Sequence, residues 1–106
     1  MTAPRTIDAI AVKESDNVAT ALRDLAAGEQ ARVGVGDRIL QVPVRQPIAF
    51  GHKLAVVEIP SGTDIRKYGE VMGRATEDIP IGAHAHVHNI ESLRGRGDLE
   101  GRRKTA

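Results

Sequence analysis

The chain has 106 residues, close to the modal size of a single domain, so we expect one core rather than two. It contains no cysteine, which excludes disulfides, thiolate metal sites and cysteine nucleophiles. A formal net charge of +1, one Phe, one Tyr and no Trp provide neither the general attraction to polyanions nor the stacking surfaces of a nucleic-acid-binding protein.

The N-terminal segment MTAPRTIDAIAVKESD lacks the hydrophobic block of a signal peptide. No apolar run elsewhere approaches the ~20 residues that a membrane-spanning helix needs. We therefore expect a cytoplasmic protein without membrane contact. A domain of this size buries a smaller share of its surface than a large domain does, which makes a homo-oligomer or a partner subunit plausible.

Two elements are expected near the N-terminus. The segment IDAIAV, residues 7–12, predicts a short strand. The following segment, NVATALRDLAAGE, has apolar side chains at helical spacing, and Gly28 stands where a helix would stop. These side chains are Val18, Ala21, Leu22 and Leu25. The pattern predicts one amphipathic helix over residues 17–27 that packs one face on a sheet.

After Gly28 the apolar period changes from that of a helix to that of strands. The segment ARVGVGDRILQV contains a Gly-Asp turn between two apolar runs, which predicts a β-hairpin. From Phe50 onward, four short β-like runs are separated by Gly and Pro: KLAVVEI, DIRKY, EVMGRA and HAHVHNI. The chain is therefore expected to be mainly β with one helix.

An internal repeat marks two of the predicted turns. The segment EIPSG, residues 58–62, recurs as DIPIG at residues 78–82. Proline presets the first central φ of a tight turn, and glycine supplies a positive φ nearby. Two copies of one turn predict two similar strand-turn-strand units that fold against each other.

The segment HAHVHN, residues 84–89, holds three of the four histidines. In a strand, His84, His86 and His88 would lie on one face, with Ala85 and Val87 directed into the core. Such a face could bind a divalent metal or a substrate, since imidazole is a common neutral ligand. The alternative is an edge strand whose imidazoles simply face solvent.

Further polar residues lie at two glycine corners. His52 and Lys53 follow Gly51, and Lys67 and Tyr68 precede Gly69. Each of these side chains alone is typical of an exposed position, but together they could converge on one pocket. No pair of carboxylates lies near the histidines in the sequence, so the catalytic set is incomplete in its acidic members.

The C-terminal segment from Glu91 loses apolar periodicity and gains Gly and Arg. We predict a domain over residues 1–92 and a basic tail over residues 93–106. Within the tail, Arg94 and Arg96 suit a loop that holds carboxylates or docks on a partner through guanidinium forks.

Residues 16–99 resemble the SAF domain of the altronate/galactarate dehydratase family, in the form where this domain is a separate small subunit. The matching motifs are Gly51-His52-Lys53, Lys67-Tyr68-Gly69-Glu70, the glycine after each Ile-Pro turn, and His86-Val87-His88-Asn89. The segment DNVATALRDLAAGE also resembles the N-terminal helix of that family.

This resemblance implies a β-clip fold and a large subunit that carries most of the active site. It implies dehydration of hexonic or hexaric sugar acids with Fe²⁺ or Mn²⁺. A sister branch, the small subunit of sulfolactate sulfo-lyase, eliminates sulfite from a three-carbon hydroxy acid. Both reactions are β-eliminations beside a carboxylate.

The resemblance also implies roles for individual residues. Metal binding falls to His86 and His88. Catalytic roles fall to His52, Lys53, Lys67 and Tyr68. Substrate binding falls to Asn89, Arg94 and Arg96. His84 lies outside the matching motifs and receives no role.

Two other functions remain open at this point. One is a stand-alone module that binds a sugar acid or another small ligand without turnover, because the SAF fold also serves as a binding appendage. The other is a purely structural protein, which the histidine-rich segment makes the weaker alternative.

Overall fold

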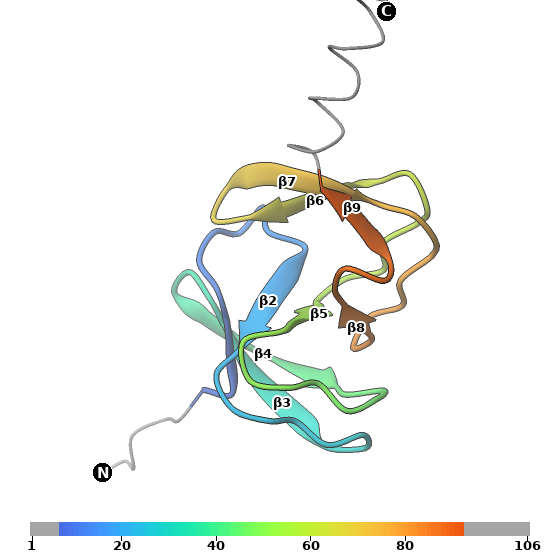
Figure 1. Ribbon diagram of the computed structural model, residues 1–106. Coiled ribbons are helices and arrows are strands. Elements are labelled where there is room, and N and C mark those ends of the chain that lie inside the picture. The colour runs from blue at the N-terminus through green and yellow to red at the C-terminus, as the bar shows by residue number, and fades with distance from the viewer. Residues whose placement is uncertain (1–6, 93–106) are drawn as a thin grey trace, which may run out of the picture.

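The computed structural model describes residues 7–92 as nine strands in two sheets, with no helix in that range (Figure 1). The strands of the larger sheet are β1 (Ala9–Ala11), β2 (Val18–Ala21), β3 (Gln30–Val35), β4 (Arg38–Pro43), β5 (Lys53–Ala55) and β8 (His84–Ala85). Those of the smaller sheet are β6 (Asp64–Lys67), β7 (Glu70–Ala75) and β9 (Ile90–Ser92). The prediction of a mainly β chain is confirmed. Over the described range, no segment is a helix of the length and apolarity that a bilayer span requires.

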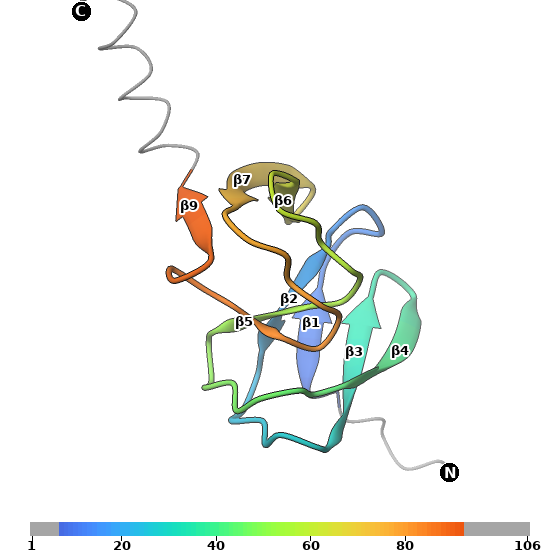
Figure 2. The ribbon, with the colours of Figure 1, turned by 90° about the vertical axis from the view of Figure 1, so that its right-hand side faces the viewer.

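The six-stranded sheet has the order β4-β3-β1-β2-β5-β8, and the three-stranded sheet has the order β6-β7-β9. The smaller sheet lies at one end of the molecule and β3 and β4 at the other, with β5 between them (Figure 2). Each end has its own buried apolar cluster, built almost entirely from Ala, Val, Leu and Ile. Short strands that fold over one another in this way fit a β-clip.

The predicted strand at residues 7–12 and the predicted hairpin are both confirmed. The first is β1, and the hairpin is β3 and β4, joined by the two residues Gly36 and Asp37. Gly36 has a φ of +56°, which a type II′ hairpin turn requires at its first central position. This turn depends on adjacent residues only, so the Gly-Asp pair between two apolar runs was enough to locate it in the sequence.

The predicted helix over residues 17–27 is wrong. Residues Val18–Ala21 form β2, which pairs antiparallel with β1 on one side and with β5 on the other. Beyond β2 the chain bends at Leu22 and Arg23, and Leu25 then forms an isolated bridge with Ile48. The apolar spacing arises because both faces of β2 are buried, whereas Leu22, on the expected apolar face, is 43% exposed. Pairing with strands distant in the sequence overrides the weak helical preference of this segment.

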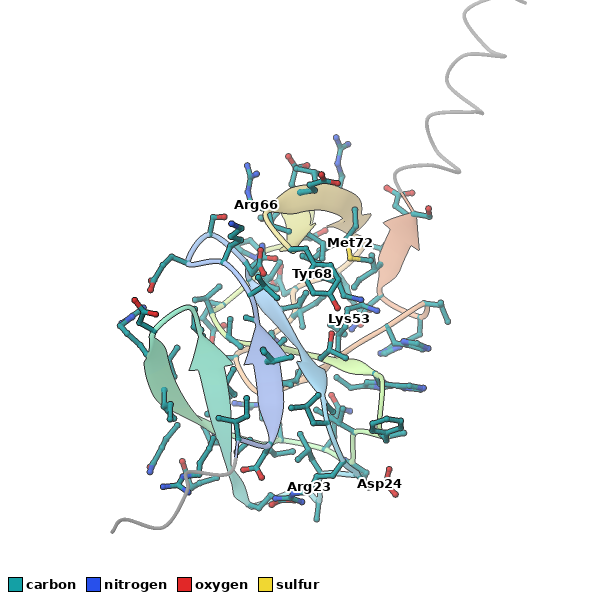
Figure 3. All side chains as sticks on the ribbon, turned by 90° about the vertical axis from the view of Figure 1, so that its left-hand side faces the viewer. Arg23, Asp24, Lys53, Arg66, Tyr68 and Met72 are labelled. Atoms are coloured by element: carbon teal, nitrogen blue, oxygen red, sulfur yellow. The ribbon has the colours of Figure 1, made fainter. Side chains whose placement is uncertain are left out.

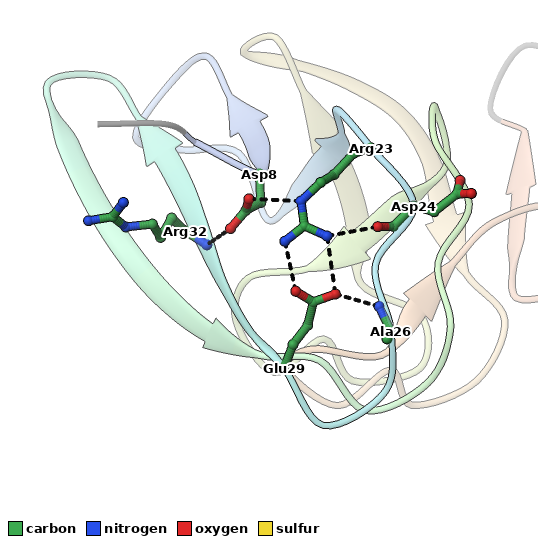
Figure 4. Close-up of polar contacts among 6 residues, drawn as sticks. All are labelled: Asp8, Arg23, Asp24, Ala26, Glu29 and Arg32. Atoms are coloured by element: carbon green, nitrogen blue, oxygen red, sulfur yellow. Dashed lines mark hydrogen bonds and ion pairs between the residues drawn. The ribbon is translucent and has the colours of Figure 1, made fainter. Parts of the chain in front are cut away.

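A cluster of charged residues fixes the loop that follows β2 (Figure 4). The guanidinium of Arg23 donates from Nε to Asp8 Oδ1 at 3.0 Å and from Nη2 to Glu29 Oε1 at 2.7 Å. Nη1 of Arg23 also donates to the main-chain oxygen of Asp24 at 2.9 Å. The carboxylate of Asp24 in turn accepts from Phe50 N at 2.8 Å. This chain of contacts connects the loop to the turn that precedes β5.

The two copies of the repeated turn lie against each other. Ile59 and Ile79 exchange both backbone hydrogen bonds, at 2.9 and 2.7 Å, in an isolated antiparallel bridge. Each turn also accepts a side-chain hydrogen bond from the other. Ser61 N donates to Asp78 Oδ1, and Ile81 N donates to Glu58 Oε2. The predicted contact between two similar units is therefore present, and we call this pair of turns the reciprocal clasp.

The two turn glycines have the same backbone conformation and different surroundings. Gly62 has a φ of +87° and Gly82 a φ of +85°, a region that favours glycine. A Cβ at Gly62 would meet nothing within 4 Å. A Cβ at Gly82 would overlap the main-chain oxygen of Pro43, which lies directly against this turn.

We expect Gly82→Ala to destabilise the fold by more than ~3 kcal/mol, because backbone strain and overlap with Pro43 add together. Gly62→Ala is the matched control and should cost about 1–2 kcal/mol, since it carries the strain alone. Urea unfolding of the two variants and the wild type measures the difference. Equal costs for both variants would contradict the close approach at Gly82.

Candidate functional site

All four histidines of the described chain lie together, and the pairing of β5 with β8 brings them there. His84 lies on β8 opposite Leu54, and Ala85 lies opposite Lys53, so the end of β5 that bears His52 faces the HAHVHN segment. The ring centroids of His52 and His86 are 3.8 Å apart with planes 10° from parallel. His84 lies 5.1 Å from His52, and His88 lies 5.0 Å from His84. We call these four residues the histidine stack.

The predicted strand over HAHVHN is only partly present. Strand β8 ends at Ala85, and residues 86–89 form a turn. Ala85 is buried as predicted, but Val87 is 82% exposed rather than in the core. The turn forms because Asn89 Oδ1 accepts from His86 N at 2.9 Å and Asn89 Nδ2 donates to His84 O at 2.8 Å. The ring of His86 therefore stacks on His52 instead of standing one strand repeat away from His84.

Asn89, which was predicted to bind a substrate, is buried in the structure. Its side chain is 3% exposed, and both ends of the amide are engaged by the backbone of its own turn. Asn89 therefore shapes the turn that carries two histidines. Its predicted contact with a substrate oxygen stays a prediction.

The two predicted lysines and the tyrosine continue the same surface. Lys53 lies beside His86 at a pocket of about 110 Å³ that is lined by Lys53, Met72, His86, Val87, Ile90 and Ser92. Lys67 ends β6, and its Nζ lies 4.9 Å from the centroid of the Tyr68 ring. Figure 3 shows Lys53, Tyr68 and Met72 close together on one face. The corner at Gly69 is thus linked to the histidines through Lys53, which the charge of Lys67 influences and which lines the same pocket as His86.

The basic groups of this surface influence one another. Burial, and then the charge of Lys67, lower the pKa of Lys53. Burial also lowers the pKa of His84 and of His86 from the ordinary 6.5, and the neighbouring imidazoles and Lys53 lower both further. Both shifts favour the neutral imidazole, which is the form that binds a metal.

Three of the histidines offer nitrogen donors that lie close together. One nitrogen each of His52, His84 and His86 lies within 4.8 Å of the others, and this group contains no carboxylate. Two ligands of one ion at ~2.0–2.2 Å lie no more than about 4.4 Å apart, so small shifts suffice. Within residues 7–92, the buried Nδ1 of His86 has no hydrogen-bond partner. These donors fit a divalent cation in kind and in spacing.

The orientation of the rings sets a condition on metal binding. The planes of His52, His84 and His86 lie within 13° of one another, and Nδ1 of His52 is 2.9 Å from Nε2 of His84. The lone pair of an imidazole nitrogen lies in its ring plane, so stacked rings must turn for all three to point at one ion. A cation therefore competes with the stack and with the contact between His52 and His84.

The donor group differs from the predicted metal pair. His86 is shared by both, while His88 lies beside His84 and outside the group. His84 had no predicted role, and His52 was predicted to be catalytic rather than a metal ligand. The sequence could not indicate their proximity, because it depends on the pairing of β5 with β8. Arg94, Arg96 and the predicted tail 93–106 lie outside the described residues.

Comparison with known proteins gives one family and several enzymes. The model of the altronate/galactarate dehydratase SAF domain matches residues 7–93. Altronate dehydratase of Escherichia coli (strain K12) is 44% identical over 83 residues, which are 78% of this chain and 16% of that enzyme. The (2R)-sulfolactate sulfo-lyase subunit alpha of Chromohalobacter salexigens is 40% identical over 58 residues, or 55% of this chain and 62% of that subunit. The same subunit of Paracoccus pantotrophus is 32% identical over 54 residues, or 51% of this chain and 81% of that subunit.

The lowered imidazole pKa values predict a loss of stability in acid. An unfolded chain takes up protons at His84 and His86 near pH 6.5, before the folded chain does. The contribution of the neutral rings is therefore present above pH 6.5 and is lost as the pH falls through the folded pKa values. Urea unfolding at a series of pH values should show this fall.

The double variant His84→Gln and His86→Gln should flatten this part of the pH dependence, because glutamine does not titrate. Asp37→Asn, an exposed substitution at the turn between β3 and β4, serves as the control and should retain the wild-type profile. An identical slope in the wild type and the double variant would refute the assignment to these two rings.

Proposed function

The chain belongs to the altronate/galactarate dehydratase SAF domain family, and we propose that it is the small subunit of a metal-dependent hydroxy-acid lyase. In this proposal it contributes imidazole and ammonium groups to an active site that a large subunit completes. The reaction is a β-elimination beside a carboxylate, with a sugar acid of the altronate or galactarate type as substrate.

The relatives support a domain that acts together with a larger protein. The chain spans 16% of the altronate dehydratases that it resembles, so most of those enzymes lies outside the matched region. Its counterparts among the sulfo-lyases are named as subunits, and it covers 62% and 81% of two of them. Both relationships support a large-subunit partner.

The single observation that carries the proposal is the convergence of basic groups from separate segments on one face. His52 and Lys53 come from the start of β5, Lys67 from the end of β6, and His84 and His86 from β8 and its turn. The predicted catalytic residues Lys67 and Tyr68 lie in contact through the ring face. A carboxylate substrate is attracted by such a surface, because two ammonium groups lie near each other.

The elimination removes a proton from the carbon beside the carboxylate and the hydroxyl from the next carbon. It therefore requires a general base, which in this proposal a carboxylate of the large subunit would provide, together with charge stabilisation and a proton donor. A bound divalent cation, Fe²⁺ or Mn²⁺, supplies Lewis-acid stabilisation of the charge that develops on the substrate carboxylate. The ring nitrogens of His52, His84 and His86 would hold it. Lys53, whose pKa is lowered by burial and by Lys67, suits the protonation of the departing hydroxyl, since a donor works best with a pKa near the operating pH.

The donor group provides bases and no carboxylate, so the partner would provide the acidic residues. Two exposed apolar side chains flank the histidines, Phe50 at 67% and Val87 at 82% exposure. Both side chains are accessible to another protein. A face completed by a large subunit accounts for both features.

Elimination of sulfite from sulfolactate is the second candidate reaction. It is favoured by the coverage of the Paracoccus pantotrophus subunit alpha, of which the chain spans 81%. The complex with the large subunit should be assayed with altronate, galactarate and sulfolactate, with loss of water or release of sulfite as the readout. A complex that binds these acids without turnover would instead identify a binding module.

We expect His52→Ala and His86→Ala each to lower activity of the complex at least about tenfold, and to weaken Mn²⁺ binding of the full chain. The two rings contribute donors to the same group, so their substitution removes a ligand and opens the stack. Activity and Mn²⁺ titration should be measured on the same preparations. Asp37→Asn at the distant hairpin should leave both unchanged.

His88→Ala separates the predicted metal pair from the group that the structure brings together. A smaller effect of His88→Ala than of His52→Ala on Mn²⁺ binding would favour the three-histidine group. Activity within about twofold of wild type for both His52→Ala and His86→Ala would refute their part in the reaction.

A further inference from the structure

Tyr68 has a backbone conformation that its side chain does not favour. Its φ is +58°, and it is the one non-glycine residue with a positive φ in the described part of the chain. Together with Gly69, at +80°, it forms the two-residue turn between β6 and β7, since Lys67 pairs with Glu70. A hairpin turn of this kind needs a positive φ at both central residues. The two positions are normally occupied by Asn-Gly or Asp-Gly.

A buried carboxylate holds this turn from outside the hairpin. Asp16, which is 4% exposed, lies 52 residues before Tyr68 in the loop between β1 and β2. Its Oδ2 accepts from Tyr68 N at 2.9 Å and its Oδ1 accepts from Gly69 N at 2.7 Å. Oδ2 also accepts from Lys13 N at 3.1 Å, so the carboxylate is anchored in its own loop.

The neighbouring Asn17 strengthens the attachment without touching the turn residues. Asn17 Oδ1 accepts from Arg66 N at 2.8 Å, and its Nδ2 donates to Asp64 O at 2.9 Å. The β6 strand is thereby fixed by Asn17, while the turn that follows it is fixed by Asp16. The two residues therefore hold different segments, and only the hydrogen bonds of Asp16 affect the backbone conformation of Tyr68.

We propose that Asp16 is a positioning residue that fixes the corner of Lys67 and Tyr68 beside Lys53. Two hydrogen bonds to a charged acceptor stabilise a turn that tyrosine would otherwise disfavour. They place the tyrosine ring against Lys67 Nζ, and they keep the Lys67 ammonium near Lys53. The effect of this corner on catalysis rests on the proposed function, whereas its geometry does not.

The composition of the chain provides a direct readout. Tyr68 is the only tyrosine and there is no tryptophan, so the tyrosine near-ultraviolet circular dichroism of the full chain reports this ring alone. Asp16→Asn should lose most of this signal at temperatures where the chain remains folded. An unchanged signal in Asp16→Asn would overturn the proposal.

Glu14→Gln is the matched control. It removes one negative charge from the same loop, but Glu14 is exposed and pairs with Arg38 on the hairpin of β3 and β4. We expect this variant to keep the tyrosine signal. Loss of the signal in Glu14→Gln as well would also overturn the proposal, because it would show a general effect of the loop.

A second pair of variants covers the case in which Asp16→Asn fails to fold. Tyr68→Asn should raise the melting temperature by about 4 °C, since asparagine tolerates a positive φ. The double variant with Asp16→Asn should then fold, because the turn no longer needs the carboxylate. A double variant that also fails to fold would show that Asp16 secures the fold generally and would refute a specific role at Tyr68.

Turnover in the complex separates this inference from the proposed function. If Lys67 and Tyr68 take part in the elimination, Asp16→Asn should lower kcat by about 10²-fold, because small displacements of positioned groups have effects of that size. Loss of the tyrosine signal with unchanged kcat would support the positioning role. That same result would refute the roles of Lys67 and Tyr68 in the proposed reaction.

Discussion

The reciprocal clasp between the two Ile-Pro turns is the constraint on which the rest of the structure depends. The bridge between Ile59 and Ile79 is made by backbone atoms, and both side chains are 1% exposed within one apolar cluster. The acidic residue of each turn then accepts an amide of the other, so neither turn is complete by itself. Because four hydrogen bonds and two buried side chains form together, the two halves of this region must assemble cooperatively.

The clasp also determines where the candidate site lies. Each turn continues into the pairing that follows it: Gly62 N donates to Ala75 O and Gly82 N to Ala55 O, both at 2.8 Å. The second of these contacts directs β8 antiparallel to β5, which brings His84 opposite Leu54. The histidine stack is therefore a consequence of the repeat, although no histidine belongs to the repeated segment.

The sequence predicted those features whose causes are local. The hairpin of β3 and β4 and the repeated turn were found because Gly and Pro set the backbone of a few adjacent residues. The helix over residues 17–27 was wrong because β2 is defined by partners on both sides that lie elsewhere in the chain. The prediction that Val87 lies in the core was wrong for a similar reason. The turn held by Asn89 ends β8 after two residues, so the alternation of a strand does not reach Val87.

The buried polar residues and the basic residues of the candidate site have different roles. The buried polar residues in the described range are Asp8, Asp16 and Asn89, and each binds backbone amides or closes a turn. At the candidate site, the charged neighbours that lower the pKa values of Lys53 and His84 are other bases. Within residues 7–92, the buried carboxylates of Asp8 and Asp16 accept hydrogen bonds from backbone amides, whereas the group of imidazole donors contains no carboxylate. The two neighbouring ammonium groups would attract an anion, and the imidazole nitrogens offer neutral ligands to a divalent cation.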